Sequence, residues 1–148
     1  MKERNDIGFK VRILANLLKR DIEKSKCELG IELPKGINGW AISYFFDNSD
    51  KDIFQKDFEN EFSIRRSTAS NILKTMEQNG FIERKSVDYD ARLKKIVLTE
   101  KAIKIHKNVI ADIKRREKIL RKGISEKEIN AFLVTLKKLS ANMEENND

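Results

Sequence analysis

The feature of this sequence that most constrains its fold is a change of hydrophobic period at Gly80. Over residues 64–79 the apolar side chains recur at i, i+3, i+4 and i+7, which is the spacing of one helix face. These side chains are Ala69, Ile72, Leu73 and Met76. Residues 81–99 have β-rich ends around a charged centre, which predicts two strands joined by a polar loop at residues 88–92. A glycine between them suits a left-handed C-cap, so a helix followed directly by a hairpin is predicted.

Helical spacing of apolar residues predicts further helices on both sides of this segment. They are expected at residues 4–29, 38–46, 55–62, 100–122 and from Ser125 onward. Ser125 and Glu128 match the S-x-x-E capping box that opens a helix. The last six residues, 143–148, are expected to be a frayed tail. The predicted fold class is mainly α with a small β-hairpin, in a single domain over residues 1–148.

Composition narrows the class of protein. The charged fraction of 37% is high and the apolar fraction of 39% is low, which favours exposed charged faces or pairing with a second chain. The net charge of +7 suits nucleic acid, an anionic membrane surface or simple solubility. A single cysteine, Cys27, allows no intrachain disulfide. There is neither a signal-peptide pattern nor an apolar run of about 18 residues, so we expect a cytoplasmic protein that does not enter membranes.

The polar face of residues 64–79 is typical of a helix that reads DNA. Its first ten residues hold two arginines and no acid, whereas an ordinary solvated helix carries Glu–Lys pairs. A helix fits the major groove, about 12 Å wide, where Asn can pair with adenine and Arg with guanine. The candidate contacts are Arg65, Arg66, Ser67, Thr68, Ser70, Asn71 and Lys74. The alternative is a solvated face with N-terminal capping.

The polar loop of the expected hairpin, "DYDARLKK", is the second candidate contact. It places Arg92 at or near the tip, and the narrow minor groove of DNA attracts such an arginine. Asp90 cannot bind phosphate and is expected to orient Arg92 or to stiffen the turn. The candidate wing contacts are Lys85, Asp90, Arg92 and Lys94. The alternative is a merely soluble hairpin turn.

Residues 55–102 resemble the winged-helix core of MarR-type transcriptional regulators. The segment "DARLKKIVLT" places Asp90, Arg92 and Thr99 where that family has its wing aspartate, its wing arginine and its closing L-T. Two positions differ, because Ser63 stands where the family often has glycine and Arg65 where it often has a Ser or Thr N-cap. The helix cap is therefore expected to shift to Ser63.

The resemblance implies a winged helix-turn-helix lobe over residues 38–100, flanked by dimerisation helices at 1–30 and 101–148. It also implies a sequence-specific regulator of double-stranded DNA, a repressor that binds a pseudo-palindromic operator as a homodimer. The sequence supports a dimer independently of the resemblance. Three long amphipathic helices at the chain ends have a larger apolar surface than one small core can cover. The expected interface residues are Ile7, Val11, Leu14, Ile129, Phe132, Leu136, Leu139 and Met143.

Relatives in this family often respond to small aromatic ligands, so Trp40 and Tyr44 are the candidate effector pocket. An aromatic set at helical spacing is more often core, and that alternative stays open. Cys27 lies among charged residues, where a lowered thiol pKa would suit redox sensing. His106 stands alone, and zinc needs three or four ligands, so no metal or other cofactor is expected.

Other function classes have less support. No nucleophile–base set, phosphate-binding glycine loop or paired carboxylate motif is present, so no enzyme is expected. The alternatives to a sequence-specific regulator are a winged-helix protein-interaction module and a non-specific nucleoid-binding protein. Arg92 and the acid-free start of the polar helix argue against a protein-binding module, which would need neither.

Overall fold

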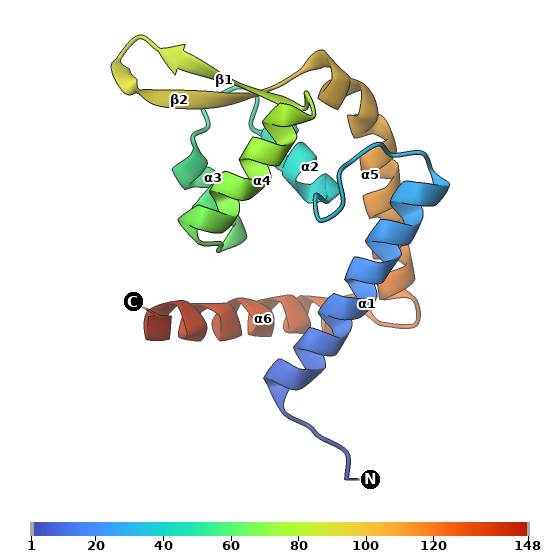
Figure 1. Ribbon diagram of the computed structural model, residues 1–148. Coiled ribbons are helices and arrows are strands. Elements are labelled where there is room, and N and C mark those ends of the chain that lie inside the picture. Colours follow the sequence, from blue (N-terminus) through green and yellow to red (C-terminus); the bar gives the residue numbers. More distant parts are fainter. Residues whose placement is uncertain (1, 148) are drawn as a thin grey trace. The chain divides into compact units, whose positions relative to one another are not determined.

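The helix–glycine–hairpin order predicted around Gly80 is present in the computed structural model, which describes residues 2–147 (Figure 1). Gly80 has a φ of 75°, the left-handed conformation expected of a C-cap glycine. The described elements are α1 (Ile7–Glu28), α2 (Gly39–Asp47), α3 (Gln55–Phe62), α4 (Arg66–Gln78), β1 (Ile82–Val87), β2 (Asp90–Leu98), α5 (Glu100–Arg121) and α6 (Glu126–Asn147). The predicted class, mainly α with a small hairpin, is confirmed. Within residues 2–147 no helix is long and apolar enough to span a bilayer.

The chain divides into two compact units, Met1–Asp112 and Ile113–Asp148, with the division inside α5. The core of the first unit is formed by α2, α3, α4, the hairpin and the start of α5. Its largest fully buried side chains are Phe58, Phe81, Ile42, Leu73, Met76 and Ile82. The predicted inner face of α4 is confirmed: Ala69, Leu73 and Met76 are fully buried and Ile72 packs against them.

The hairpin is antiparallel, with Ile82 opposite Leu98 and a register shift between Ser86 and Val87. Its turn is shorter than the expected loop, because β2 already begins at Asp90 and Arg92 lies inside the strand. The many charged residues at 88–92 predict a loop, but pairing between the strands continues through Asp90. Thr99 closes the hairpin: its hydroxyl donates to the Gly80 carbonyl at 2.6 Å and accepts from the Ala102 N–H at 3.3 Å. The latter bond is that of a helix N-cap.

The expected shift of the α4 cap to Ser63 is wrong. Ser63 is the C-cap of α3, with φ 47° and ψ 47°, and it is the one non-glycine residue with positive φ among residues 2–147. A left-handed residue is needed there to turn the chain between α3 and α4, so a serine occupies a conformation that favours glycine. The N-cap of α4 is Arg65, whose side chain makes no capping hydrogen bond.

The capping box at the start of α6 is confirmed. The Glu128 N–H donates to Ser125 Oγ at 3.1 Å, and the Ser125 N–H donates to Glu128 Oε2 at 2.9 Å. The expectation of a frayed tail from residue 143 is wrong, since α6 continues to Asn147. No glycine or proline interrupts this last stretch, so the helix has no local reason to stop earlier. Asp148 lies outside the described residues.

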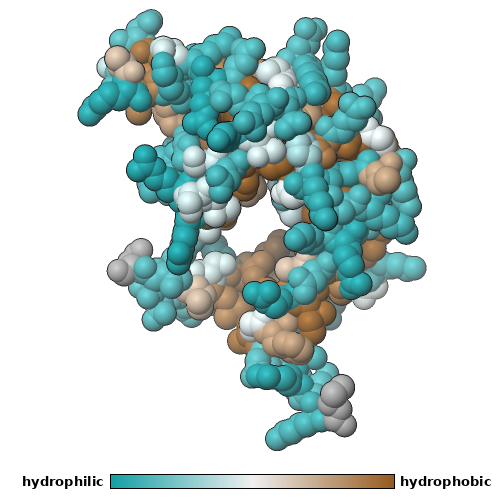
Figure 2. All heavy atoms as spheres, in the orientation of Figure 1, coloured by the Kyte–Doolittle hydropathy of each residue, from teal (hydrophilic) through white to brown (hydrophobic). Residues whose placement is uncertain are grey.

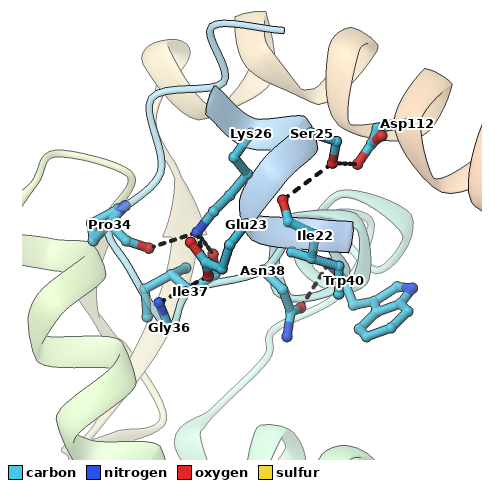
Figure 3. Close-up of polar contacts among 10 residues, drawn as sticks. All are labelled: Ile22, Glu23, Ser25, Lys26, Pro34, Gly36, Ile37, Asn38, Trp40 and Asp112. Carbon is cyan, nitrogen blue, oxygen red and sulfur yellow. Dashed lines mark hydrogen bonds and ion pairs between the residues drawn. The ribbon is translucent and has the colours of Figure 1, made fainter. Parts of the chain in front are cut away.

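A buried lysine holds the irregular connection at residues 29–38 against α1 (Figure 3). Lys26 is only 6% exposed, and its ammonium donates to the carbonyls of Pro34 at 3.0 Å and Ile37 at 2.9 Å. Glu23 lies 3.0 Å from the same ammonium and compensates its charge. A buried charge is tolerated only when it is paired and hydrogen-bonded in this way.

The start of α2 lies so close to α5 that only glycine fits. A Cβ on Gly39 would overlap Cγ1 of Val109, a stiff β-branched side chain that is itself buried. We expect Gly39→Ala to lower the free energy of unfolding by about 1–2 kcal/mol, measured by chemical denaturation. The matched control is Gly8→Ala in α1, where no atom lies within 4 Å of the added carbon. Equal stability of the two variants would contradict this close approach.

Candidate nucleic-acid interface

The outer face of α4 is exposed and polar, and it carries no acid before Glu77 near the end of the helix. Residues 63–76 contain neither Asp nor Glu. The structure places all the candidate contacts of this helix at the surface: Arg65, Arg66, Ser67, Thr68, Ser70, Asn71 and Lys74. Among residues 2–147, the side chains of Ser67, Thr68, Ser70 and Asn71 form no hydrogen bond, so their donors and acceptors remain open to a ligand. The helix N-terminus adds a partial positive charge to this face.

Gln55, the first residue of α3, fixes the start of α4. Its side-chain amide donates to the Arg66 carbonyl at 3.5 Å and accepts from Arg84 Nη1 at 3.4 Å. Arg84 belongs to β1, so one side chain joins α3, α4 and the hairpin. Phe58 packs beneath them in the core, and Ile64 packs against that core. α3 and α4 are thus joined to each other and to the hairpin, as in a helix-turn-helix.

Asp90 and Arg92 form a tight pair on the hairpin. Asp90 Oδ1 accepts from the Arg92 backbone N–H at 2.9 Å and from Nε at 3.1 Å, while Oδ2 accepts from Nη2 at 2.9 Å. These hydrogen bonds from Arg92, first from its side chain and then from its backbone, lower the pKa of Asp90. The Arg92 side chain is 89% exposed, so the pair orients a guanidinium that still faces solvent. The expectation that Asp90 orients Arg92 is confirmed.

The other two candidate wing residues have weaker local partners. Lys94 Nζ donates to Ser86 Oγ at 2.6 Å across the hairpin, and Lys85 Nζ lies 3.7 Å from the Glu83 carboxylate on its own strand. Both lysines are exposed. Exposed pairs of this kind contribute little to stability, so these cations remain available to phosphate.

Sequence reasoning missed Asp52 and Tyr89. The Tyr89 hydroxyl at the hairpin turn donates to Asp52 Oδ2 at 2.9 Å, and Lys95 Nζ donates to Asp52 Oδ1 at 3.2 Å. Asp52 lies in the connection between α2 and α3, 37 residues before Tyr89. Neither local spacing nor residue type signals a contact over such a separation.

The two candidate effector residues lie on α2. A cavity of about 540 Å³ is lined by Trp40, Ser43, Tyr44, Asp47, Asn48, Lys51, Glu61 and Phe62. Tyr44 also packs edge-on against Phe62, with 5.7 Å between ring centroids, so it belongs partly to the aromatic core. Burial, followed by the charges of Asp57 and Glu61, raises the pKa of Tyr44. In Figure 3 the Trp40 ring points away from the Lys26 contacts.

The expected interface residues of α1 and α6 are not buried within the chain. On α1, Ile7 is 59% exposed, and Val11 and Leu14 are also exposed. On α6 no residue is buried; Phe132 and Met143 are exposed, and Ile129, Leu136 and Leu139 are half-buried. In Figure 2 hydrophobic residues reach the surface over α1 and over α6. Each helix therefore presents an apolar face that this chain leaves accessible to water.

The remaining candidates for sensing, Cys27 and His106, lie on different helices. Cys27 is exposed near the end of α1. His106, on α5, stacks on Phe46 with ring centroids 3.7 Å apart, and burial lowers its pKa. The structure thus gives His106 an aromatic packing partner.

Comparisons with known proteins agree with this geometry. The model of the MarR family matches residues 49–94, which run from the α2–α3 connection through α4 into the hairpin. No curated protein matches the chain. The transcription regulator MarR from Oenococcus oeni PSU-1 is 28% identical with a TM-score of 0.76, covering 95% of this chain and 99% of that one.

Two further solved structures are similar over almost the whole chain. A MarR-family regulator from Listeria monocytogenes, crystallised with a 26-mer DNA, is 26% identical with a TM-score of 0.82, covering 97% of this chain and 92% of that one. The heme sensor protein PefR from Streptococcus agalactiae, in complex with heme, is 28% identical with a TM-score of 0.64 and 95% coverage of both chains. Taken with the family match over residues 49–94, these likenesses show that the chain resembles MarR-type transcription regulators and shares their winged helix fold.

Proposed function

We propose that this protein is a transcription regulator that binds double-stranded DNA sequence-specifically as a homodimer. The observation that carries the proposal is the exposed polar face of α4, acid-free through residue 76, together with a hairpin that presents Arg92. The net charge of +7 favours a polyanionic partner. The Listeria monocytogenes relative, which shares this fold, was crystallised with DNA.

In the proposed complex α4 lies in the major groove and the hairpin follows the backbone to the adjacent minor groove. Ser67, Ser70 and Asn71 face base edges, because N-terminal residues of a recognition helix reach furthest into the groove. Arg65, Arg66 and Lys74 contact phosphate or guanine. On the wing, Arg92 enters the minor groove, and Lys85 and Lys94 contact phosphate.

The homodimer is supported by the apolar faces of α1 and α6. Large exposed apolar surfaces on a charged protein mark an interaction site, and a second copy of the chain presents the same faces. A two-fold dimer reads a pseudo-palindrome with half-sites about 10 bp apart. Bound at a promoter, such a dimer excludes polymerase, which makes the protein a repressor.

A small aromatic effector would act through the cavity on α2. Besides Trp40 and Tyr44, this cavity is lined by Ser43, whose buried hydroxyl has no hydrogen-bond partner among residues 2–147. A polar group on a bound ligand would satisfy that hydroxyl. Binding would favour one spacing of the two recognition helices over another and thereby release the operator.

Selection of bound duplexes from random DNA tests the proposal. The expected result is enrichment of a palindrome with half-sites about one helical turn apart. Binding without sequence preference and with steep salt dependence would instead show a non-specific nucleoid protein. No binding to any duplex at low salt would favour a protein-interaction module. Repeating the selection with candidate aromatic compounds tests the effector.

Replacement of Asn71 by Ala should relax base preference more than it weakens non-specific binding. An amide that pairs with one base edge contributes about 1–3 kcal/mol of discrimination but little affinity for other sequences. Gln78→Ala is the matched control, because Gln78 is an exposed amide at the far end of α4. Equal losses for every duplex tested would show that Asn71 does not read bases.

A further inference from the structure

The tip of the hairpin is tied to the α2–α3 connection through a single carboxylate. Asp52 uses both of its oxygens, accepting from the Tyr89 hydroxyl at 2.9 Å and from the Lys95 ammonium at 3.2 Å. Tyr89 lies in the turn, and Lys95 lies on β2. The carboxylate therefore bonds the hairpin at two points, the turn and strand β2. We call these three residues the wing clamp.

A backbone bond reinforces the wing clamp at the next residue. The Ile96 N–H donates to the Ile53 carbonyl at 2.7 Å, and Ile53 is buried in the core. Residues 52 and 53 are thus joined to β2 by a side chain and by the main chain. An isolated two-stranded hairpin is only marginally stable in water, so its tip depends on contacts of this kind.

The wing clamp lies one residue from the Arg92 pair. Tyr89 immediately precedes Asp90, and Asp90 holds the Arg92 guanidinium by two side-chain hydrogen bonds. Restraint of the turn therefore continues through Asp90 to Arg92. Within residues 2–147 Arg92 forms no hydrogen bond or ion pair with Asp52, so any influence of Asp52 on it passes through the hairpin.

From this geometry we infer that Asp52 is a positioning residue for Arg92, holding the hairpin tip in the orientation that the minor-groove contact requires. The inference rests on the proposed DNA-binding function. DNA repels acidic side chains, and yet a positioning role means that Asp52 strengthens DNA binding. Hydrogen bonds from Tyr89, and then from Lys95, lower the pKa of Asp52, so the carboxylate stays ionised at neutral pH.

The direction in which DNA affinity changes when Asp52 is replaced distinguishes a positioning role from simple electrostatics. Asp52→Ala raises the net charge of +7 by one unit, and Coulomb attraction alone then predicts tighter binding to DNA. A positioning role predicts weaker binding. Asp50→Ala is the matched control, because Asp50 is an exposed acid in the same connection with no described partner. Tyr89→Phe removes one bond of the wing clamp without changing any charge.

The experiment measures affinity for the selected operator and hydrogen exchange of residues 88–95 in all three variants. We expect Asp52→Ala to weaken binding about three- to tenfold, Tyr89→Phe to weaken it less, and Asp50→Ala to leave it unchanged or tighter. In an Arg92→Ala background the loss from Asp52→Ala should disappear, since coupled residues are not additive. Backbone exchange at the tip should be faster in Asp52→Ala and unchanged in Asp50→Ala.

Each outcome either supports or overturns the positioning role of Asp52. Binding by Asp52→Ala as tight as that of Asp50→Ala overturns the inference, as does an equal loss with and without Arg92. Unchanged exchange at the tip overturns it too, because this readout needs no DNA. If the unaltered protein ignores every duplex while exchange rises in Asp52→Ala, the proposed function has failed and the restraint of the tip by Asp52 stands.

Discussion

Replacing Leu136 with Asp should convert the proposed homodimer into monomers. Leu136 lies half-buried on α6, at the centre of the apolar face formed with Ile129, Phe132, Leu139 and Met143. An unpaired carboxylate buried in an apolar interface costs about 3–5 kcal/mol, and two-fold symmetry places two copies there. The dissociation constant should therefore rise by at least about a hundredfold, measured by sedimentation velocity over a concentration series.

Ala131→Asp provides the control for Leu136→Asp. It makes the same change of charge on the same helix, but Ala131 is exposed and lies on the side of α6 away from Leu136. This variant should remain dimeric. Circular dichroism should show that both variants keep their helices, so that dissociation is not mistaken for unfolding. A stable dimer of Leu136→Asp would place the interface elsewhere.

Arg92→Ala should weaken operator binding by about 1–3 kcal/mol for each half-site, with folding intact. The side chain is 89% exposed and packs into no core, so its loss leaves the hairpin register unaffected. Both protomers lose the contact, and the effect on a dimer is roughly doubled. Fluorescence anisotropy at fixed salt measures the affinity, and thermal denaturation checks the fold.

Arg92→Lys separates charge from geometry at the same position. Lysine keeps the positive charge but lacks the planar fork that Asp90 holds through Nε and Nη2. We expect an affinity between those of the unaltered protein and Arg92→Ala. Unchanged affinity in both variants would rule out Arg92 as a DNA contact and leave α4 to carry recognition alone.

The sequence predicted those parts of the fold that depend on local periodicity. The inner face of α4, the left-handed Gly80 and the Ser125–Glu128 capping box all follow from spacing within a few residues. The outward position of Asn71 and its neighbours follows from the same helical period, so the candidate contacts on α4 are exposed as expected.

What the sequence could not predict depends on backbone conformation or on distant partners. Ser63 adopts a left-handed conformation that its residue type disfavours, because the turn between α3 and α4 demands it. The sequence predicts too long a hairpin turn, since the charged residues at 90–92 resemble a loop but continue the strand. The bond between Asp52 and Tyr89 joins residues that only the folded core brings together.

The buried Lys26 has a consequence for how this chain can diverge. Its ammonium recognises main-chain oxygens of Pro34 and Ile37, and every amino acid supplies such an oxygen. Solvent-facing side chains of the 29–38 connection, such as Glu32 and Lys35, are therefore free to drift. Lys26 itself is not free to change. A methionine of similar length would leave the two carbonyls buried without a hydrogen-bond donor. Part of the evolutionary constraint on this connection therefore lies in a neighbouring helix, in addition to its own buried residues Ile31 and Ile37.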